Sequence, residues 1–441
     1  MMLGIAAQLP PAGSSGDVPE GAVIFLDFVN SIFWDGTELV NSTELLSDFD
    51  VADVNGDGLV LGAGNWPIAT GAFFDTFTDL LANGGVTVVV ELTIDGQYNI
   101  GTGSQFATGP IMQIMDGTDA DLTTNAIYAD IYDGFHLYVG DSNDLTEVGG
   151  DVDTAQPAGI ERRAFTLFRD LGGGSWQTAS TTNGGPAQST TTSHGGGYFT
   201  VVEIDVFGVE SWTYPLEKAR VRRLTVYEAK TPAEIDAATD ISDWPQWIAY
   251  TTNSSGPAAT SHPVTAPAHE TGDLIIVFAA FDGTPTISIA SGTGWTIGDQ
   301  QVSNGQVVGA WIWKIADGSD TLTLGSSDSE KMSYVAMSYR NAAAFEAAFT
   351  TGTTADAQSP SFSPSGGAGK YAFVSVIMTD GSAGTPAAPP ANMSRYMSQV
   401  GTSDGGSVYY ADKWVDGDGF APAAFDLTAQ EWVGFTLALH A

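Results

Sequence analysis

The sequence predicts an all-β protein made of two β-sandwich domains that follow a short N-terminal arm. The chain has 441 residues, which is long for one hydrophobic core and favours two domains of roughly 100 to 200 residues each. It contains 53 glycines, and its apolar residues alternate with polar ones or form short runs, which is typical of strands joined by tight turns. Long amphipathic periods are rare, so we expect helices to be short and few.

The chain is strongly acidic. It carries 52 Asp and Glu against 14 Lys and Arg, a formal net charge of −38. Such a field repels nucleic acid and anionic membrane surfaces, so we expect no nucleic-acid partner. No base precedes Arg162, and eight of the 14 bases lie between Arg162 and Lys230. Two interpretations stay open: a solvated surface suited to salty water, or a surface that binds divalent cations or a basic partner.

The N-terminus predicts an arm over residues 1–19. It has no positively charged segment, and its run of about seven apolar residues is short for a secretory signal. Pro10, Pro11 and a Gly/Ser stretch follow, so the arm is either disordered or a docking peptide. No run approaches the roughly 20 apolar residues of a membrane span. The chain has no cysteine, which excludes disulfides, thiolate metal sites and a cysteine nucleophile.

The first domain is expected over residues 20–236. Apolar runs at 22–29 and 86–94 are of the kind buried between two sheets. Turns rich in Gly, Asp and Asn separate the other strand candidates, which fits two antiparallel sheets. We expect residues 172–197 to form a long exposed loop or a hairpin flap. The other strand candidates are 111–115, 126–131, 135–139, 163–169, 199–207 and 221–227.

Residues 220–235 predict where this domain ends. A strand-like alternation is followed by Thr231, Pro232 and Glu234, which are a helix cap, a proline at the first helical position and an early acid. The closing strand and this Thr-Pro-Ala-Glu-Ile tail resemble those of laminin-G-like, concanavalin-A-type jelly rolls. The resemblance implies a jelly roll that binds or builds rather than catalyses.

A linker at 237–246 and a second domain at 247–441 are expected next. The sequence motifs of this domain follow in the order Gly272-Asp273-Leu274, then Gly294-Trp295, then Tyr339-Arg340. This order resembles an immunoglobulin-like sandwich module that recurs in phage tail and head-appendage proteins and in bacterial surface proteins. Further strand candidates are 307–315, 320–324, 332–340, 371–378, 407–414 and 432–439.

One strand has an enzyme-like pattern. Alternation places Glu203 and Asp205 on one face, which resembles the E-x-D-x-x-E nucleophile, helper and acid of β-glucanases with a jelly-roll fold. The third acid protonates the leaving oxygen, but Gly208 occupies its position and Glu210 is displaced by two residues. We therefore expect no catalytic residues and no enzymatic activity.

A calcium site is predicted at Asp53, Asn55 and Asp57. These residues and the glycines that follow match the first six positions of a calcium loop. The acid expected at position 12 is absent, because Gly64 stands there. A plain turn between strands is the alternative. No other cofactor is expected, and the five histidines lack zinc-binding spacing.

Tryptophans raise a second kind of site. Trp311 and Trp313 share one face of a predicted strand, and planar rings suit the apolar faces of pyranose sugars. Buried core aromatics are the alternative, because alternation shows that both rings point the same way but not which way.

The basic cluster is the one positive region of the chain. It comprises Lys218, Arg220, Arg222 and Arg223. We expect Arg220 and Arg222 to lie on one strand face. They would pair either with the acids of the glucanase-like strand or with a neighbouring subunit.

The two resemblances together imply a non-enzymatic bacteriophage virion structural protein, such as a fibre, spike or capsid decoration. The expected location is the virion surface, with arm 1–19 bound to other capsid or tail proteins, a homo-oligomer such as a trimer, and host-surface glycans as possible ligands. The alternatives are a secreted, extracellular carbohydrate-binding adhesin and, less favoured, a jelly-roll glycoside hydrolase.

Overall fold

A computed structural model gives the fold as two compact units. The first comprises Met1–Gln156 and Ile160–Ile241, and the second Pro157–Gly159 and Ser242–Ala441. The division after Ile241 falls inside the expected linker. The structure describes residues 18–47, 54–55, 58–59, 67–94, 110–115, 126–131, 135–140, 146–147, 159–182, 187–193, 203–206, 219–254, 257–384, 390, 392–393, 395–399 and 405–441.

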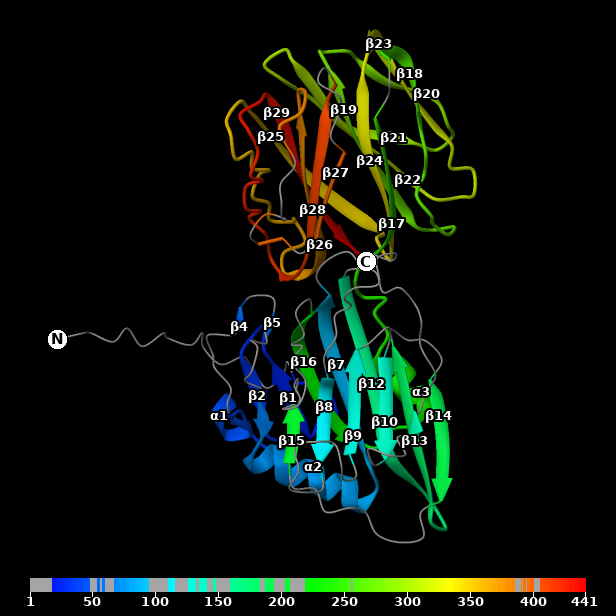
Figure 1. Ribbon diagram of the computed structural model, residues 1–441, viewed down its shortest axis with the longest axis vertical. Helices are drawn as coiled ribbons and strands as arrows, with labels where there is room; N and C mark the ends of the chain where they lie inside the picture. The colour runs from blue at the N-terminus through cyan, green and yellow to red at the C-terminus, as the bar shows by residue number, and fades with distance from the viewer. Residues whose placement is uncertain are drawn as a thin grey trace, which may run out of the picture. The chain divides into compact units, whose positions relative to one another are not determined.

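The prediction of an all-β fold with sandwiched sheets is confirmed (Figure 1). In the first unit, one antiparallel sheet has the order β14 (Gln188–Ser193), β13 (Ser175–Thr182), β12 (Gly159–Gly172), β7 (Val86–Ile94), β16 (Ala219–Glu228), β1 (Ile24–Asp27) and β2 (Ile32–Trp34). A short hairpin of β4 (Val54–Asn55) and β5 (Gly58–Leu59) joins this sheet beside β16. The second sheet has the order β11 (Thr146–Glu147), β10 (Phe135–Gly140), β9 (Ala126–Ile131), β8 (Pro110–Met115), β15 (Glu203–Val206), β6 (Ile68–Ala69) and β3 (Leu46–Ser47).

The predicted closing strand lies in the interior of the first sheet. It is β16, which pairs antiparallel with both β1 and β7. The short helix predicted after it is also confirmed as α3 (Pro232–Ala238). Thr231 caps this helix, because its Oγ1 accepts from the Glu234 amide at 3.3 Å while its own amide donates to the Glu234 carboxylate at 2.7 Å. For residues 172–197, the hairpin alternative is the one that the structure shows, because β13 and β14 pair antiparallel at the end of the first sheet.

Alternation along β7 separates the core from the outer face of the first sheet. Its even-numbered residues from Val86 to Leu92 lie in the core, so Glu91 lies on the outer face. Helix α3 covers part of that face with the buried Ile235. The longer helix α2 (Gly71–Asn83) was not predicted, although its buried side chains are spaced at i, i+4 and i+8 as Phe73, Phe77 and Leu81. Helix α1 (Ser42–Leu45) is a single turn.

The second unit contains three stacked sheets, one more than a two-sheet sandwich. The middle sheet has the order β17 (Gln246–Ser254), β24 (Met332–Arg340), β19 (Leu274–Asp282), β22 (Val307–Ile315) and β21 (Thr296–Ser303). One face packs against β18 (Ala259–Val264), β23 (Leu322–Glu330) and β20 (Ile287–Ser291). The other packs against β25 (Ala344–Gly352), β29 (Trp432–His440), β26 (Gly369–Thr379), β28 (Ser407–Gly417) and β27 (Arg395–Gln399).

The third sheet explains the long apolar runs of this unit. All residues of β19 from Leu274 to Phe281 are buried, because sheets cover both faces of the strand. Close approach of the two larger sheets requires glycine at Gly309, where a Cβ would lie 2.9 Å from both Met378 Cε and Val433 Cβ. No helix in the described ranges is long and apolar enough to cross a membrane.

Candidate functional site

Aromatic side chains meet where the edge strands β21 and β25 of neighbouring sheets face each other. Trp311 and Trp313 come from β22, and Phe345 comes from β25. The Phe345 ring centroid lies 5.5 Å from that of Trp311 and 4.8 Å from that of Trp313, with interplanar angles of 87° and 73°. The prediction that the two tryptophans share a strand face is therefore confirmed, and this face points toward β25.

The rings differ in exposure, so they do not have one role. Trp311 is 5% exposed and belongs to the core, which was one of the two sequence-based interpretations. Trp313 and Phe345 are half-buried. Phe345, Ala347 and Phe349 lie on the same face of β25. The Phe349 side chain is 50% exposed. The cluster therefore begins as core at Trp311 and ends as aromatic surface at Phe349.

A glycine lets the Trp311 indole cover the edge strand. A Cβ at Gly298 would lie 2.2 Å from Trp311 Cζ2, so no other residue fits beneath the ring. The strand register shifts between Ile297 and Asp299, which leaves Gly298 as the extra residue of a bulge. The bulge and the glycine together bring the indole over β21.

Two polar side chains lie on the same face of β21. Asp299 is opposite Trp311 in the strand register, and Gln301 is opposite Gly309. The Gln301 Nε2 group donates to Asp299 Oδ1 at 3.0 Å and to Oδ2 at 2.9 Å. Beyond Gln301, the Ser303 hydroxyl donates to the Gly352 carbonyl at 3.0 Å and ties β21 to β25. We define the aromatic edge as Asp299, Gln301, Trp311, Trp313, Phe345 and Phe349.

The aromatic edge has the chemistry of a sugar platform. Ring faces accept the apolar C–H face of a pyranose, and carboxylate and amide oxygens accept hydrogen bonds from its hydroxyls. It has no acid and base placed for proton transfer, since Asp299 is the one titratable side chain among its six residues. Within the described ranges, no group of three or more His, Asp or Glu is placed to hold a metal ion.

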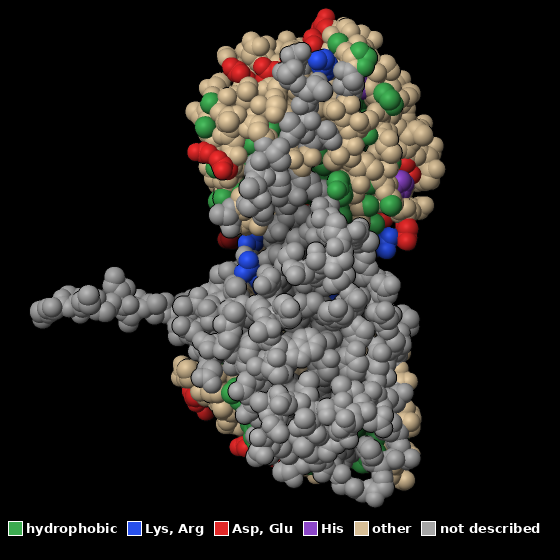
Figure 2. Space-filling model, in the orientation of Figure 1, with side chains coloured by type: hydrophobic (Ala, Val, Ile, Leu, Met, Phe, Trp, Pro, Cys, Tyr) green, Lys and Arg blue, Asp and Glu red, His purple; other side chains and the backbone are tan. Residues whose placement is uncertain are grey.

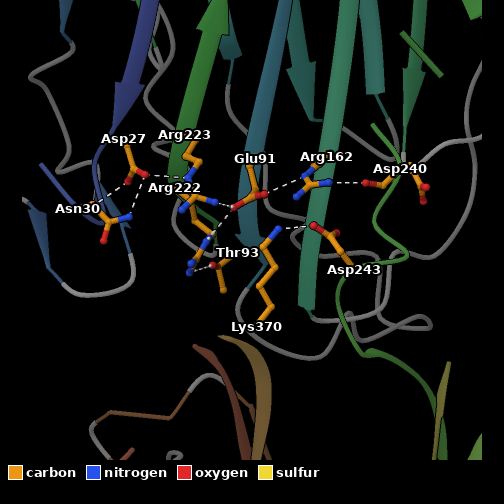
Figure 3. Close-up of polar contacts among 10 residues, drawn as sticks. All are labelled: Asp27, Asn30, Glu91, Thr93, Arg162, Arg222, Arg223, Asp240, Asp243 and Lys370. Atoms are coloured by element: carbon orange, nitrogen blue, oxygen red, sulfur yellow. Dashed lines mark hydrogen bonds and ion pairs between the residues drawn. The ribbon is translucent and has the colours of Figure 1, made fainter. Parts of the chain in front are cut away.

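A second cluster, in the first unit, joins Glu91 to Arg162, Arg222 and Arg223 (Figure 3). Glu91 Oε1 pairs with Arg222 Nε at 3.2 Å and with Arg223 Nη1 at 3.1 Å, while Oε2 pairs with Arg162 Nε at 2.8 Å. Arg223 Nε also reaches Asp27 Oδ2 at 2.8 Å. The cluster therefore joins β1, β7, β12 and β16 across the outer face of the sheet.

The strand register explains why Arg222 and Arg223 both reach one carboxylate. It shifts between Val221 and Arg223, so Arg222 is the extra residue of a bulge. Strict alternation predicted Arg220 and Arg222 as the pair on one face. The intramolecular alternative for Arg222 is confirmed, but its described ion pair is with Glu91 of β7 instead of the acids of β15.

The pKa of Glu91 shows how strongly the arginines act. Burial alone would raise the pKa of this carboxyl, yet Arg223, Arg222 and Arg162 outweigh burial and lower it to about 2. Glu91 therefore stays ionised at pH values well below those at which an ordinary glutamate takes up a proton. Glu91 is therefore a structural tie, because its ion pairs hold β7 to β12 and β16.

Other predicted site residues lie partly beyond the described part of the chain. Asp53 and Asp57 fall outside it, and Asn55 ends β4, where its backbone faces Gly58 in a tight hairpin. The calcium site stays a prediction. Glu203 and Asp205 lie on β15, which pairs with β8 and β6, but their side chains are outside the described set. Lys218, Gly208 and Glu210 are outside it as well.

No pattern in the sequence indicates the carboxyl cluster at one end of the second unit. Asp282 ends β19, Asp380 follows β26, and Glu431 precedes β29, so three distant segments bring them together. Burial, the charge and hydrogen bond of Asp282, and the charge of Glu431 raise the pKa of Asp380 to about 6. Asp380 therefore holds a proton in the folded state at pH values where an ordinary aspartate has lost it.

Stability should consequently fall with rising pH across this window. A folded pKa raised above the usual 3.8 means that the Asp380 contribution is fully present below pH 3.8 and is lost as pH rises through about 6. Thermal melting of Asp380→Asn should be less dependent on pH between 4 and 7 than melting of the wild type. Asp418→Asn, which removes the same charge at an exposed position, is the matched control; equal pH slopes in both variants would contradict the assignment.

No protein-family model and no curated protein matches the chain. Among solved structures, it is similar to a Trypanosoma rangeli sialidase at 16% identity and a TM-score of 0.32, over 50% of this chain and 32% of the sialidase. It is also similar to domain 4 of AbnA, a GH43 extracellular arabinanase from Geobacillus stearothermophilus solved in complex with arabinotriose. That match has 14% identity and a TM-score of 0.31, over 50% of this chain and 98% of the domain. The chain thus spans about a third of the sialidase's length.

These comparisons correct the functional prediction. The similar structures are a sialidase and an arabinanase domain, and neither is a virion protein. The prediction of a bacteriophage virion structural protein is therefore wrong. The arm 1–19 is predicted to be an anchor, and its residues 1–17 lie outside the described part of the chain. The predicted trimer stays a prediction.

Proposed function

We propose that the chain is a carbohydrate-binding protein that does not cleave its ligand, and that the ligand binds at the aromatic edge of the second unit. The observation that carries this proposal is the half-buried pair of Trp313 and Phe345, 4.8 Å apart, continued by the exposed Phe349. Aromatic rings held by packing between two sheets offer a sugar a rigid surface at little cost in conformational entropy.

The polar neighbours support the same proposal. Asp299 and Gln301 hold each other in place through two hydrogen bonds, so their oxygens are oriented before a ligand arrives. A sugar presents both C–H groups and hydroxyls, so its site needs apolar side chains beside preorganised hydrogen-bond acceptors.

Binding without cleavage is supported by the sequence. The glucanase-like strand has Gly208 where the third carboxylate would stand, and a third acid is needed to protonate the leaving oxygen. The resemblance of the first unit's closing segment to laminin-G-like domains also implies binding rather than catalysis.

The test is a glycan array with the full chain, followed by calorimetric titration of the best ligand. Phe349→Ala should weaken binding at least about tenfold, which corresponds to about 1.4 kcal/mol, and Trp313→Ala should weaken it at least as much. Phe349 is half exposed, so its variant should fold even if Trp313→Ala does not.

Val302→Ala provides the matched control for these variants. Val302 is 45% exposed and lies on β21, but it pairs in register with Val308, which packs toward the three-stranded sheet. Its truncation removes exposed apolar surface from the opposite face and should leave affinity unchanged. Equal losses in Val302→Ala and Phe349→Ala would argue against the site, and a wild-type chain that binds no glycan would refute the function.

A further inference from the structure

We infer that the glycan bound at the aromatic edge is neutral, and that glycans carrying carboxylate, sulfate or phosphate groups are rejected. This inference rests on the proposed function and names the ligand class of the same site. It follows from three features of the second unit: the polar groups at the edge, the position of the nearest base, and the charge of the whole unit.

The polar groups at the edge accept hydrogen bonds. Asp299 is an acceptor when ionised, and the Nε2 group of Gln301 already donates to its two oxygens at 3.0 and 2.9 Å. The Gln301 Oε1 atom is a further acceptor. Sugar hydroxyls can donate to all of these oxygens, whereas an ionised acid group has no proton to donate. An acidic sugar would bring like charge against Asp299.

The strands that build the edge present no cation to it. Among β21, β22, β25 and β29 the one Lys or Arg is Lys314, and its position next to Trp313 in β22 puts it on the opposite face of the sheet. Its side chain is 2% exposed, with Nζ bound to Asp317 at 2.7 Å and to Asp320 at 2.9 Å. Lys314 is therefore committed to its own loop and does not attract an anionic ligand.

The charge of the whole unit acts in the same direction. Residues 242–441 contain 18 acids and six bases, a formal charge of −12. Figure 2 shows Asp and Glu side chains at several places on the visible face of this unit. A like charge brought close to Asp299 is repelled, and the repulsion grows as water is excluded from between the two charges. A neutral sugar meets no such repulsion.

The experiment compares neutral ligands with acidic ligands of related structure. Lactose with sialyllactose, and methyl-esterified with de-esterified polygalacturonate, make two pairs, titrated into the full chain at about 20 and about 500 mM salt. The neutral member of any bound pair should bind at least about tenfold more tightly at low salt, with affinity independent of salt. The difference in affinity between the neutral and the acidic member should be smaller at high salt, because screening weakens the repulsion.

Two variants separate the local charge from the overall field. Asp299→Asn should raise the affinity for the acidic member relative to the neutral one at least about threefold. Asp418→Asn changes net charge equally at an exposed site and should leave the ratio unchanged.

Each failure points to a different conclusion. An acidic member that binds as tightly as its neutral counterpart would overturn the inference while leaving carbohydrate binding intact. If Asp299→Asn leaves the affinity for the acidic member relative to the neutral one unchanged, the role of Asp299 would be overturned. Binding of neither member of either pair, with no hit on the array, would overturn the proposed function and this inference with it.

Discussion

Glu91→Gln is expected to destabilise the first unit by about 3–5 kcal/mol. The substitution keeps the size of the side chain but removes the charge that Arg162, Arg222 and Arg223 share. Arg222 is 1% exposed and cannot recover its hydration, so it becomes a buried charge close to two other arginines. Urea unfolding would measure the loss, and hydrogen exchange of the β7 and β16 amides would assign it to this sheet.

Two comparisons make this expectation specific. Glu38→Gln removes the same charge at an exposed position of the same unit and should change stability little. In the wild type, the contribution of Glu91 is present above its unfolded pKa of 4.5 and is lost as pH falls toward about 2. Glu91→Gln should lack that acid-dependent component. An unfolding free energy within about 1 kcal/mol of wild type would show that the cluster is not a structural tie.

Much of the fold could be predicted because local patterns are strong where packing is regular. The apolar run of β7, the closing strand β16 and the capped helix α3 each have a signal within about ten residues of sequence. The third sheet of the second unit was missed for a physical reason. The continuous apolar run of β19 shows that both faces are covered, but not which strands cover them.

The candidate site could be predicted only in part. Alternation placed Trp311 and Trp313 on one face, but Phe345 lies more than 30 residues further along the chain and on a different sheet. Bulges are a second limit, because one extra residue changes which side chains share a face. The bulge at Arg222 directs two consecutive arginines to Glu91, and no period in the sequence indicates it.

Gly298→Ala is expected to destabilise the second unit by about 1–3 kcal/mol and to abolish glycan binding. The new methyl group would lie 2.2 Å from Trp311 Cζ2 and 2.3 Å from Cη2, so the indole must leave its position over β21. Trp311 contacts Phe345, and Phe345 in turn contacts Trp313, so displacement of the first ring disturbs the whole aromatic edge. Thermal unfolding and titration with the array-selected glycan would measure the two effects.

A double-mutant cycle would show whether the clash with Trp311 causes the loss of stability in Gly298→Ala. Trp311→Ala removes the ring that the new methyl group strikes, so Gly298→Ala should cost much less in that background than in the wild type. Gly417→Ala is the control, because a Cβ there meets nothing closer than Val415 Cγ1 at 3.5 Å. Alanine has a higher strand propensity than glycine, so this control should be neutral or slightly stabilising. If Gly298→Ala costs the same with and without the Trp311 ring, the loss comes from the backbone of the bulge, and the indole does not depend on the glycine beneath it.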